Sequence, residues 1–267
     1  MGTGQFRMLR CSIAGVEAVS ARSRHSFPRH THDRFGIGVI DCGAHRSLSG
    51  RGMVEAGPGD TITVNPGEVH DGMPIGDGGR SWRMLYIDPS LVADILRDMS
   101  EGRTAEIEFA HPVASDARAA RRFQGLFSAL TGEGGLLQGE ERLWALLASM
   151  THRGSGPGGS DAVPGGIALA QSRIDDDPAM PLTLSDLARS CGLSRFQVLR
   201  GFARSTGLTP HAYLVQRRIQ LARRLIAGGT PLAQAALGSG FADQSHMTRI
   251  FVRTYGVSPR AYARAIR

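Results

Sequence analysis

A pattern that occurs twice in the last 84 residues limits what this chain can fold into more than any other feature. The first copy occupies residues 184–213, and the second occupies residues 232–262. The copies match at an offset of 48 residues up to Gly192 and Gly240, and at an offset of 49 residues beyond them. The one extra residue therefore falls in a predicted turn, where an insertion is easiest to accommodate.

Each copy predicts a short helix, a glycine turn and a second helix. Ser194 and Asp243 stand where the second helices begin, and both residue types are strong N-caps. Between the copies, Pro210 is placed to open a long helix that Gly228 and Gly229 can end. Such a tandem helix-turn-helix arrangement offers two helices that can enter DNA grooves about one helical turn, roughly 34 Å, apart.

The charge of the chain is distributed unevenly. From residue 167 onward there are 14 Arg and 5 Asp, a net charge of +9, whereas the preceding residues hold 17 Arg against 19 Asp and Glu, a net charge of −2. All 31 basic residues are Arg, which suits bidentate contact with phosphate and guanine. The positive charge therefore lies in the part that carries the repeat, as expected if that part meets a polyanion.

Composition divides the chain into three parts. Residues 1–153 begin with short strand-like runs punctuated by Gly, Pro and Asp up to residue 88, and continue with helical periodicity. Residues 154–166 are rich in Gly, Ser and Pro and predict a flexible linker. Residues 167–267 are helical throughout. We therefore expect an α+β multidomain protein with two independent folding units.

Cysteine usage and hydropathy indicate a cytoplasmic protein. Cys11, Cys42 and Cys191 are odd in number and have no metal or redox spacing, so a reducing compartment is the simplest setting. The N-terminus lacks the apolar core of a signal peptide, and no apolar run approaches the length that spans a bilayer. We expect no membrane association.

The second helix of each copy has one apolar face and one face suited to reading DNA. Val198 and Phe202 in the first copy, and Met247 and Phe251 in the second, should be buried. Arg pairs with guanine, Gln pairs with adenine, and an aromatic ring contacts the thymine methyl. The side chains expected to contact DNA are Arg195, Phe196, Gln197, Arg200, Arg204, Gln244, Ser245, His246, Thr248 and Arg249.

Four motifs in this region are shared with one family: Leu184-x-x-Leu-Ala-x-x-x-Gly192, Gly207-Leu-Thr-Pro210, Gly240-Phe-x-x-Gln-Ser-x-x-x-Arg-x-Phe251 and Gly256-Val-Ser-Pro-x-x-Tyr262. On these motifs, residues 167–267 resemble the DNA-binding domain of the AraC/XylS family of transcription regulators. The resemblance implies that both recognition helices contact bases in double-stranded promoter DNA. Because the two reading faces differ, we expect an asymmetric site.

The N-terminal part resembles the sensor domain of the same family, a cupin-like β-barrel. The segments that carry this resemblance are His30-Thr-His32, Pro58-Gly-Asp60 and Asn65-Pro-Gly-Glu-Val-His70. An H-x-H pair on a strand directs both imidazoles to one side. A barrel of this size can enclose a small effector. The side chains expected to line the effector site are His30, His32, Arg34, His70, Trp82 and Tyr86.

Three histidines also leave a metal site open as an alternative, with His30, His32 and His70 as ligands. Metal-binding cupins usually add a Glu soon after the pair, but residues 35–40 contain no carboxylate. We therefore expect neither a metal nor another cofactor. The histidines can equally hydrogen-bond the turns of the barrel and each other.

These observations favour a ligand-responsive transcription regulator that is not an enzyme, and we expect an activator rather than a repressor, in contact with RNA polymerase. The rival hypothesis is a cupin metalloenzyme with a DNA-binding tail. Leu143, Leu147 and Met150 form an apolar stripe. This stripe either pairs two chains as a homodimer or packs on its own domain.

Overall fold

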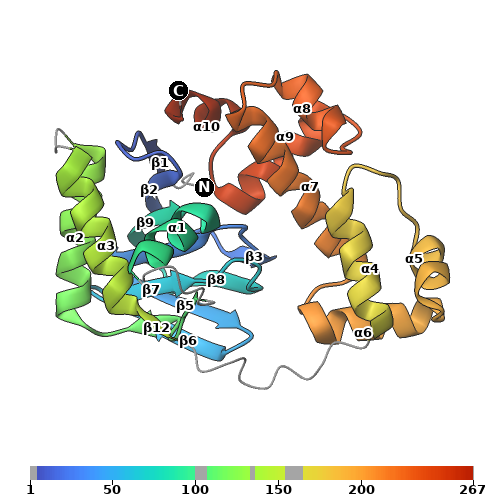
Figure 1. Ribbon diagram of the computed structural model, residues 1–267, viewed down its shortest axis with the longest axis horizontal. Coiled ribbons are helices and arrows are strands. Elements are labelled where there is room, and N and C mark those ends of the chain that lie inside the picture. The colour runs from blue at the N-terminus through green and yellow to red at the C-terminus, as the bar shows by residue number, and fades with distance from the viewer. Residues whose placement is uncertain (1–4, 100–106, 133–135, 154–164, 267) are drawn as a thin grey trace. The chain divides into compact units, whose positions relative to one another are not determined.

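The computed structural model describes residues 5–99, 107–132, 136–153 and 165–266. The chain forms two compact units that divide near residue 156 (Figure 1). The first unit combines β-sheets with helices, and the second unit is helical, as the sequence predicts. Most of the predicted linker, residues 154–166, lies outside the described residues, but helix α4 already begins at Gly165.

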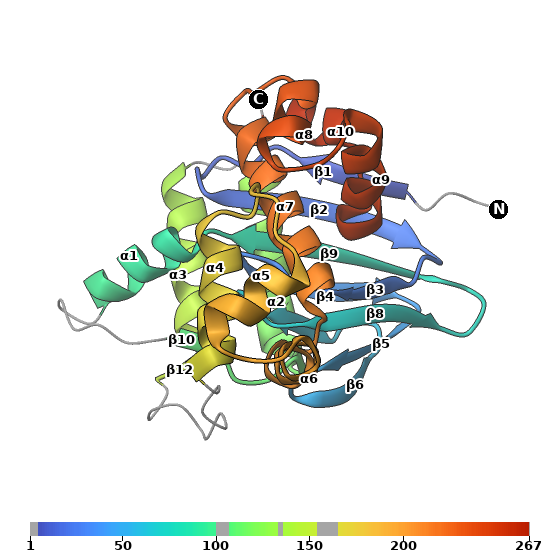
Figure 2. The same ribbon diagram turned by 90° about the vertical axis from the view of Figure 1, so that its right-hand side faces the viewer.

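The first unit is built on two antiparallel sheets (Figure 2). The larger sheet has six strands in the order β1 (Gln5–Leu9), β2 (Val16–Ser23), β9 (Arg80–Ile87), β4 (Phe35–Cys42), β7 (Thr61–Val64) and β11 (Val113–Ala114). The smaller sheet has four strands in the order β3 (Phe27–His30), β8 (His70–Ile75), β5 (Ala44–Ser49) and β6 (Gly52–Ala56). A separate pair joins β10 (Ile107–Phe109) to β12 (Thr151–Arg153).

The expected β-rich, cupin-like domain is confirmed, but among the described residues its two sheets remain separate and open and do not close into a barrel. The edge strand β3 shows why closure fails. Pro28 lies within β3 and has no N–H to donate to a further strand, and the pairing of β3 with β8 shifts register between Phe27 and His30. A strand edge with a missing donor and a shifted register cannot continue the ladder.

The alternating side chains of β9 give the larger sheet two different faces. Leu85 and Ile87 belong to the main hydrophobic core of the unit. Trp82, Met84 and Tyr86 lie on the opposite face and form a second cluster with Val19 and its neighbours. The first face is covered by helices and the second faces the smaller sheet, so the space between the sheets is where a ligand site has to be sought.

Three helices complete the first unit: α1 (Pro89–Met99), α2 (Ala117–Thr131) and α3 (Leu136–Met150). Figure 1 shows α2 and α3 side by side. Leu143 and Leu147 of the predicted stripe are 1% and 0% exposed within the main core, while the side chain of Met150 lies outside the described residues. The two leucines thus pack on their own unit, which is one of the alternatives that the sequence allows.

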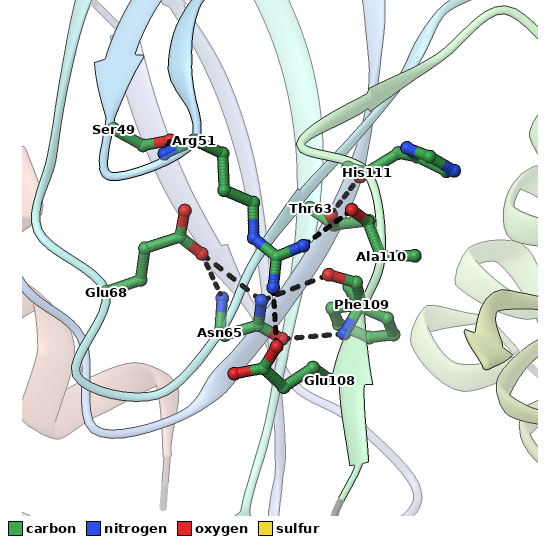
Figure 3. Close-up of polar contacts among 9 residues, drawn as sticks. All are labelled: Ser49, Arg51, Thr63, Asn65, Glu68, Glu108, Phe109, Ala110 and His111. Carbon is green, nitrogen blue, oxygen red and sulfur yellow. Dashed lines mark hydrogen bonds and ion pairs between the residues drawn. The ribbon is translucent and has the colours of Figure 1, made fainter. Parts of the chain in front are cut away.

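The motif Asn65-Pro-Gly-Glu-Val-His70 makes hydrogen bonds to the segment that contains β10 (Figure 3). The side chain of Asn65, only 7% exposed, accepts a hydrogen bond from the Phe109 amide at 2.8 Å and donates one to the Phe109 carbonyl at 3.2 Å. Glu68 accepts from the backbone and side-chain nitrogens of Asn65, both at 3.2 Å. Asn65 thus satisfies both backbone groups of Phe109.

Replacing Asn65 by Ala should lower the free energy of unfolding of the first unit by about 2–3 kcal/mol, because the Phe109 amide and carbonyl lose their partner in a buried place. Urea denaturation measures this change. The control is Arg51→Ala, which removes an exposed ion pair with Glu108 and should cost no more than about 1 kcal/mol. Equal costs for the two variants would contradict the role given to Asn65.

In its described residues, the second unit contains seven helices: α4 (Gly165–Asp176), α5 (Leu184–Cys191), α6 (Arg195–Thr206), α7 (Pro210–Ala227), α8 (Leu232–Gly238), α9 (Gln244–Tyr255) and α10 (Pro259–Ala265). The long helix α7 begins at Pro210 behind the N-cap Thr209 and ends before Gly228, as predicted. Asp175 of α4 accepts hydrogen bonds from Tyr213 at 2.9 Å and from Arg217 at 2.6 Å, so α4 is fixed to α7.

Candidate functional site

Each of the two helices of the first helix-turn-helix unit, α5 and α6, begins with a capping box. The Thr183 side chain accepts from the Asp186 amide, and the Asp186 carboxylate accepts from the Thr183 amide. Ser194 and Gln197 make the same reciprocal pair at the start of α6. Such pairs satisfy amides that a helix start otherwise leaves without partners. The start of α6 is therefore set by local sequence.

The second helix-turn-helix unit, formed by α8 and α9, repeats this geometry with one difference. Asp243 caps α9 by accepting a hydrogen bond from the His246 amide at 2.7 Å. Helix α6 begins three residues after Gly192, whereas α9 begins four residues after Gly240. The extra residue thus lies in the turn of the second helix-turn-helix unit, between α8 and α9, as the offset of the repeat predicts. Both glycines have positive φ, 65° and 80°.

The predicted inner and outer faces of α6 and α9 are confirmed. Val198, Phe202, Met247 and Phe251 are all 0% exposed. All ten side chains predicted to contact DNA are exposed or partly exposed: Arg195, Phe196, Gln197, Arg200, Arg204, Gln244, Ser245 and Arg249 are exposed, and His246 and Thr248 are intermediate. The structure thus places both sets on the solvent side of their helices.

Local contacts divide these ten side chains further. Phe196 is 65% exposed, and the Arg200 guanidinium lies 5.5 Å from the centre of its ring, so the two form one cationic and apolar surface. Gln197 uses its side-chain oxygen to accept from the Ser194 amide at 2.8 Å. The His246 ring packs edge-on against Phe241 at 5.3 Å. Gln197 and His246 therefore also have structural roles.

In the β-rich first compact unit of the chain, the predicted histidines come together between the two sheets. His30 ends β3, His32 follows it by two residues, and His70 begins β8 opposite His30. The His30 and His32 Nε2 atoms are 3.2 Å apart, and the His30 and His70 ring centres are 4.4 Å apart. The ring of Tyr86 lies 5.0 Å from that of His32. Four of the six predicted effector residues thus form one cluster.

Backbone contacts orient the imidazoles of this cluster. His30 Nδ1 lies 2.7 Å from the Pro28 carbonyl, and His70 Nδ1 lies 3.1 Å from the Glu68 carbonyl. Since carbonyls only accept, each Nδ1 carries the proton and each Nε2 keeps its lone pair. Burial lowers the pKa of His30 to about 3 and that of His70 to about 4. Both rings are therefore neutral acceptors at pH 7.

The three histidines also have the geometry of a metal site. One nitrogen of each lies within 4.8 Å of the others. Neutral imidazoles with Nδ1 held by carbonyls are the usual ligands of Zn²⁺ and related ions. The donor set therefore fits a transition metal as well as the hydroxyl or N–H group of an organic ligand.

Two predicted effector residues lie elsewhere. Trp82 is not in the histidine cluster but contacts Phe6 and Phe27 edge-on, with ring centres 5.8 and 6.2 Å away. Arg34 has its guanidinium 3.0 Å from the Glu17 carboxylate. The charge of Arg34 is therefore already balanced within the protein, and Arg34 is a weak candidate for binding an effector.

Two further residues lie between the sheets, Arg80 and His45, which the sequence patterns did not predict. Arg80 is 3% exposed and packs 4.8 Å from the Trp82 ring centre. Burial, with a smaller contribution from the charge of Arg80, lowers the pKa of His45 to about 4. The alternation of side chains along β9 could have predicted the position of Arg80, because residues 80, 82, 84 and 86 lie on the same face of the strand.

Comparison with known proteins agrees with this arrangement. Residues 13–147 match the model of the AraC-like ligand binding domain, and residues 187–265 match that of a helix-turn-helix domain. The chain belongs to the AraC family of transcription regulators. It is thus a DNA-binding transcription regulator with an N-terminal ligand-binding domain.

Two relatives of this AraC-family chain match over most of its length. The uncharacterized HTH-type transcriptional regulator YbfI of Bacillus subtilis is 27% identical over 83% of this chain and 81% of its own. The transcriptional activator NphR of a Rhodococcus species is 30% identical over 84% of this chain and 61% of its own.

A solved structure shares the fold of the regulator at low identity. Apo ToxT from Vibrio cholerae aligns over 100% of this chain and 99% of its own with a TM-score of 0.57 and 14% identity. In the described part of the AraC-family chain, no helix combines the length and hydropathy needed to cross a bilayer.

Proposed function

We propose that this regulator activates transcription from an asymmetric promoter site, and that a small molecule bound between its two sheets controls it. The observation that carries the proposal is the difference between the exposed faces of α6 and α9. The first face offers Arg195 and Arg200 beside Phe196, while the second offers Gln244 and Arg249. Two different reading faces in one unit recognise two different base sequences.

Arg200→Ala and Arg249→Ala should each weaken operator binding by about 5- to 150-fold, since a bidentate Arg–guanine contact contributes about 1–3 kcal/mol. Quantitative gel shifts with the DNA upstream of the regulated gene measure the loss at fixed salt. The control is Arg121→Ala, which removes one exposed positive charge from α2 in the other unit. Unchanged sequence-specific binding by both variants would contradict the assigned contacts.

The effector site that we propose lies on His30, His32, His70 and Tyr86, with Trp82 and Arg80 nearby. Its support is the convergence of neutral acceptors and aromatic rings in the domain that matches a ligand-binding family. A thermal-shift screen against sugars, amino acids and aromatic acids tests it, because a bound effector raises the melting temperature. Failure of every class to do so would favour a regulator that acts through protein partners.

The rival function is a cupin metalloenzyme, which the three converging histidines favour. Metal analysis of the purified chain distinguishes the two. We expect operator binding that does not depend on a metal, and we expect no enzymatic role. Stoichiometric iron, manganese or zinc that is lost on replacing His30, His32 and His70 together would instead support the rival.

Two further partners belong to this proposal, RNA polymerase and a second copy of the chain. The relative NphR is named a transcriptional activator, which supports activation and hence contact with RNA polymerase in the cytoplasm.

A homodimer would use the side of α3 that its own unit leaves open. Trp144 on that side is 37% exposed and borders a groove of about 650 Å³ with Leu91 and Ile95. Sedimentation velocity measures whether two chains associate.

A further inference from the structure

Arg80 places a positive charge between the two sheets of the ligand-binding unit. It pairs with Ser23 in the larger sheet and shares a face of β9 with Trp82. A Cβ added to Gly72 of the smaller sheet would lie 3.5 Å from an Arg80 nitrogen and 3.0 Å from the His45 ring. Arg80 therefore spans the space between the sheets and lies over Gly72, with only 3% of its surface exposed.

The partners of Arg80 leave its charge unbalanced. Among the residues that the structure describes, its one hydrogen bond goes from a terminal nitrogen to the His25 carbonyl at 3.3 Å, and its buried Nε has no partner. No carboxylate within the described residues lies within ion-pair distance of it. Arg34 and Arg83, which are also partly buried in this unit, both have such a carboxylate.

An unbalanced buried charge is costly. Transfer of an ion out of water is repaid only by a close counter-ion and by hydrogen bonds that satisfy its remaining protons. The pKa of Arg80 is lowered to about 10 by burial alone, which reflects the lack of an opposing charge, yet Arg80 stays protonated at pH 7. His45 beside it also has a buried Nδ1 without a partner. Both groups are suited to an anionic ligand.

Apolar rings border Arg80 on its accessible side. Phe6, Phe27 and Trp82 form an aromatic rim, in which every pair meets edge-on with ring centres 5.8–6.2 Å apart. All three are partly exposed, whereas Arg80 is buried. The Arg80 guanidinium lies 4.8 Å from the Trp82 ring centre and 5.9 Å from that of Phe27. The charge thus sits at the inner end of an apolar, partly open surface.

We propose that Arg80 binds the carboxylate of a small monoanionic effector whose apolar body rests on the aromatic rim of Phe6, Phe27 and Trp82. A guanidinium donates two parallel hydrogen bonds to a carboxylate, and its single charge balances one negative charge. This inference rests on the proposed function and specifies the chemical class of its effector.

The experiment uses the full chain with Trp144→Phe, which leaves Trp82 as the one tryptophan reporter. The probes are phenylacetate and octanoate, each compared with its neutral amide, up to about 20 mM, above the ~1 mM dissociation constant expected for one charged contact. The readouts are Trp82 emission and the melting temperature. Arg80→Met removes the charge at similar volume, Arg80→Lys keeps it, and Arg46→Met is the matched control on an exposed Arg of β5.

The acids should change Trp82 emission and raise the melting temperature, and the amides should not. Arg80→Met should abolish both responses, Arg80→Lys should weaken binding about tenfold because an ammonium lacks the paired donors, and Arg46→Met should respond like the parent. The proposal is overturned if neither acid acts, if the amides act equally, or if Arg80→Met still binds the acids.

Failure of this inference is distinguishable from failure of the proposed function. A neutral compound that stabilises the parent and Arg80→Met equally would overturn the carboxylate assignment and leave an effector-controlled regulator intact. Operator binding is measured on the same variants by gel shift. Its absence in the parent chain would refute the proposed function, whatever the acids do.

Discussion

Gly240→Ala should unfold the second helix-turn-helix unit at much lower denaturant than the parent. Gly240 has φ = 80°, a left-handed conformation that costs an alanine about 1–2 kcal/mol. An added Cβ would also lie 2.8 Å from the Ala179 carbonyl oxygen and 2.9 Å from the Ala179 Cα. These are backbone atoms of a segment that Arg218 fixes through the Pro178 carbonyl at 2.8 Å. We expect a total loss of about 3–5 kcal/mol.

The matched control for this substitution is Gly192→Ala in the turn of the first helix-turn-helix unit. Gly192 has φ = 65°, but no atom of the described part of the chain, apart from its own neighbours in sequence, lies within 4 Å of its added Cβ. Only the conformational cost of about 1–2 kcal/mol applies there. Denaturant unfolding followed by helix circular dichroism gives both values. If the two variants lose equal stability, the close packing around Gly240 is not what the second turn requires.

Mild acid should destabilise the ligand-binding unit. His30, His45 and His70 have pKa values lowered by burial to about 3, 4 and 4, from an ordinary value of 6.5. Below pH 6.5 the unfolded chain takes up protons on these side chains, whereas the folded unit resists them. The stabilisation is therefore complete above pH 6.5 and falls as the pH drops toward 4, by up to about 2 kcal/mol per histidine between pH 6.5 and 5.

Urea denaturation at a series of pH values measures this slope, and His70→Asn should reduce it by close to one proton. His211→Gln, an exposed histidine of α7, provides the control and should leave the slope unchanged. A free energy of unfolding that stays constant between pH 7 and 5 would contradict the account. That result would mean that the cluster is held in another form, for example by a bound metal.

The helical half could be predicted closely because its determinants are local. The N-caps Ser194 and Asp243, the glycine turns and the buried residues at four-residue spacing all act within one or two helical turns. What local reasoning missed was competition for the same atoms. Gln197 looks like a base-reading residue, but its side-chain oxygen closes a capping box with Ser194.

The sheet half was predictable in part. The H-x-H pair and the Pro-Gly-x-x-His turn correctly brought three histidines together, although His30 and His70 lie on strands and His32 lies beyond the end of β3. The partners of Arg34 and Arg80 depend on strand pairing, which the sequence does not reveal. Glu17 of β2 balances Arg34, which precedes β4, whereas Arg80 meets no acid in the described chain. The open sheets were missed for the same reason.

The most direct test of the central claim is the base specificity of the two recognition helices, measured separately. Binding of the parent, Arg200→Ala and Arg249→Ala to a library of singly substituted operators gives the preference at every base pair. We predict that each variant loses preference at its own positions, about one helical turn apart, and retains it at the other's. Loss of preference at the same positions by both, or a uniform loss of affinity without loss of preference, would contradict an asymmetric site read by α6 and α9.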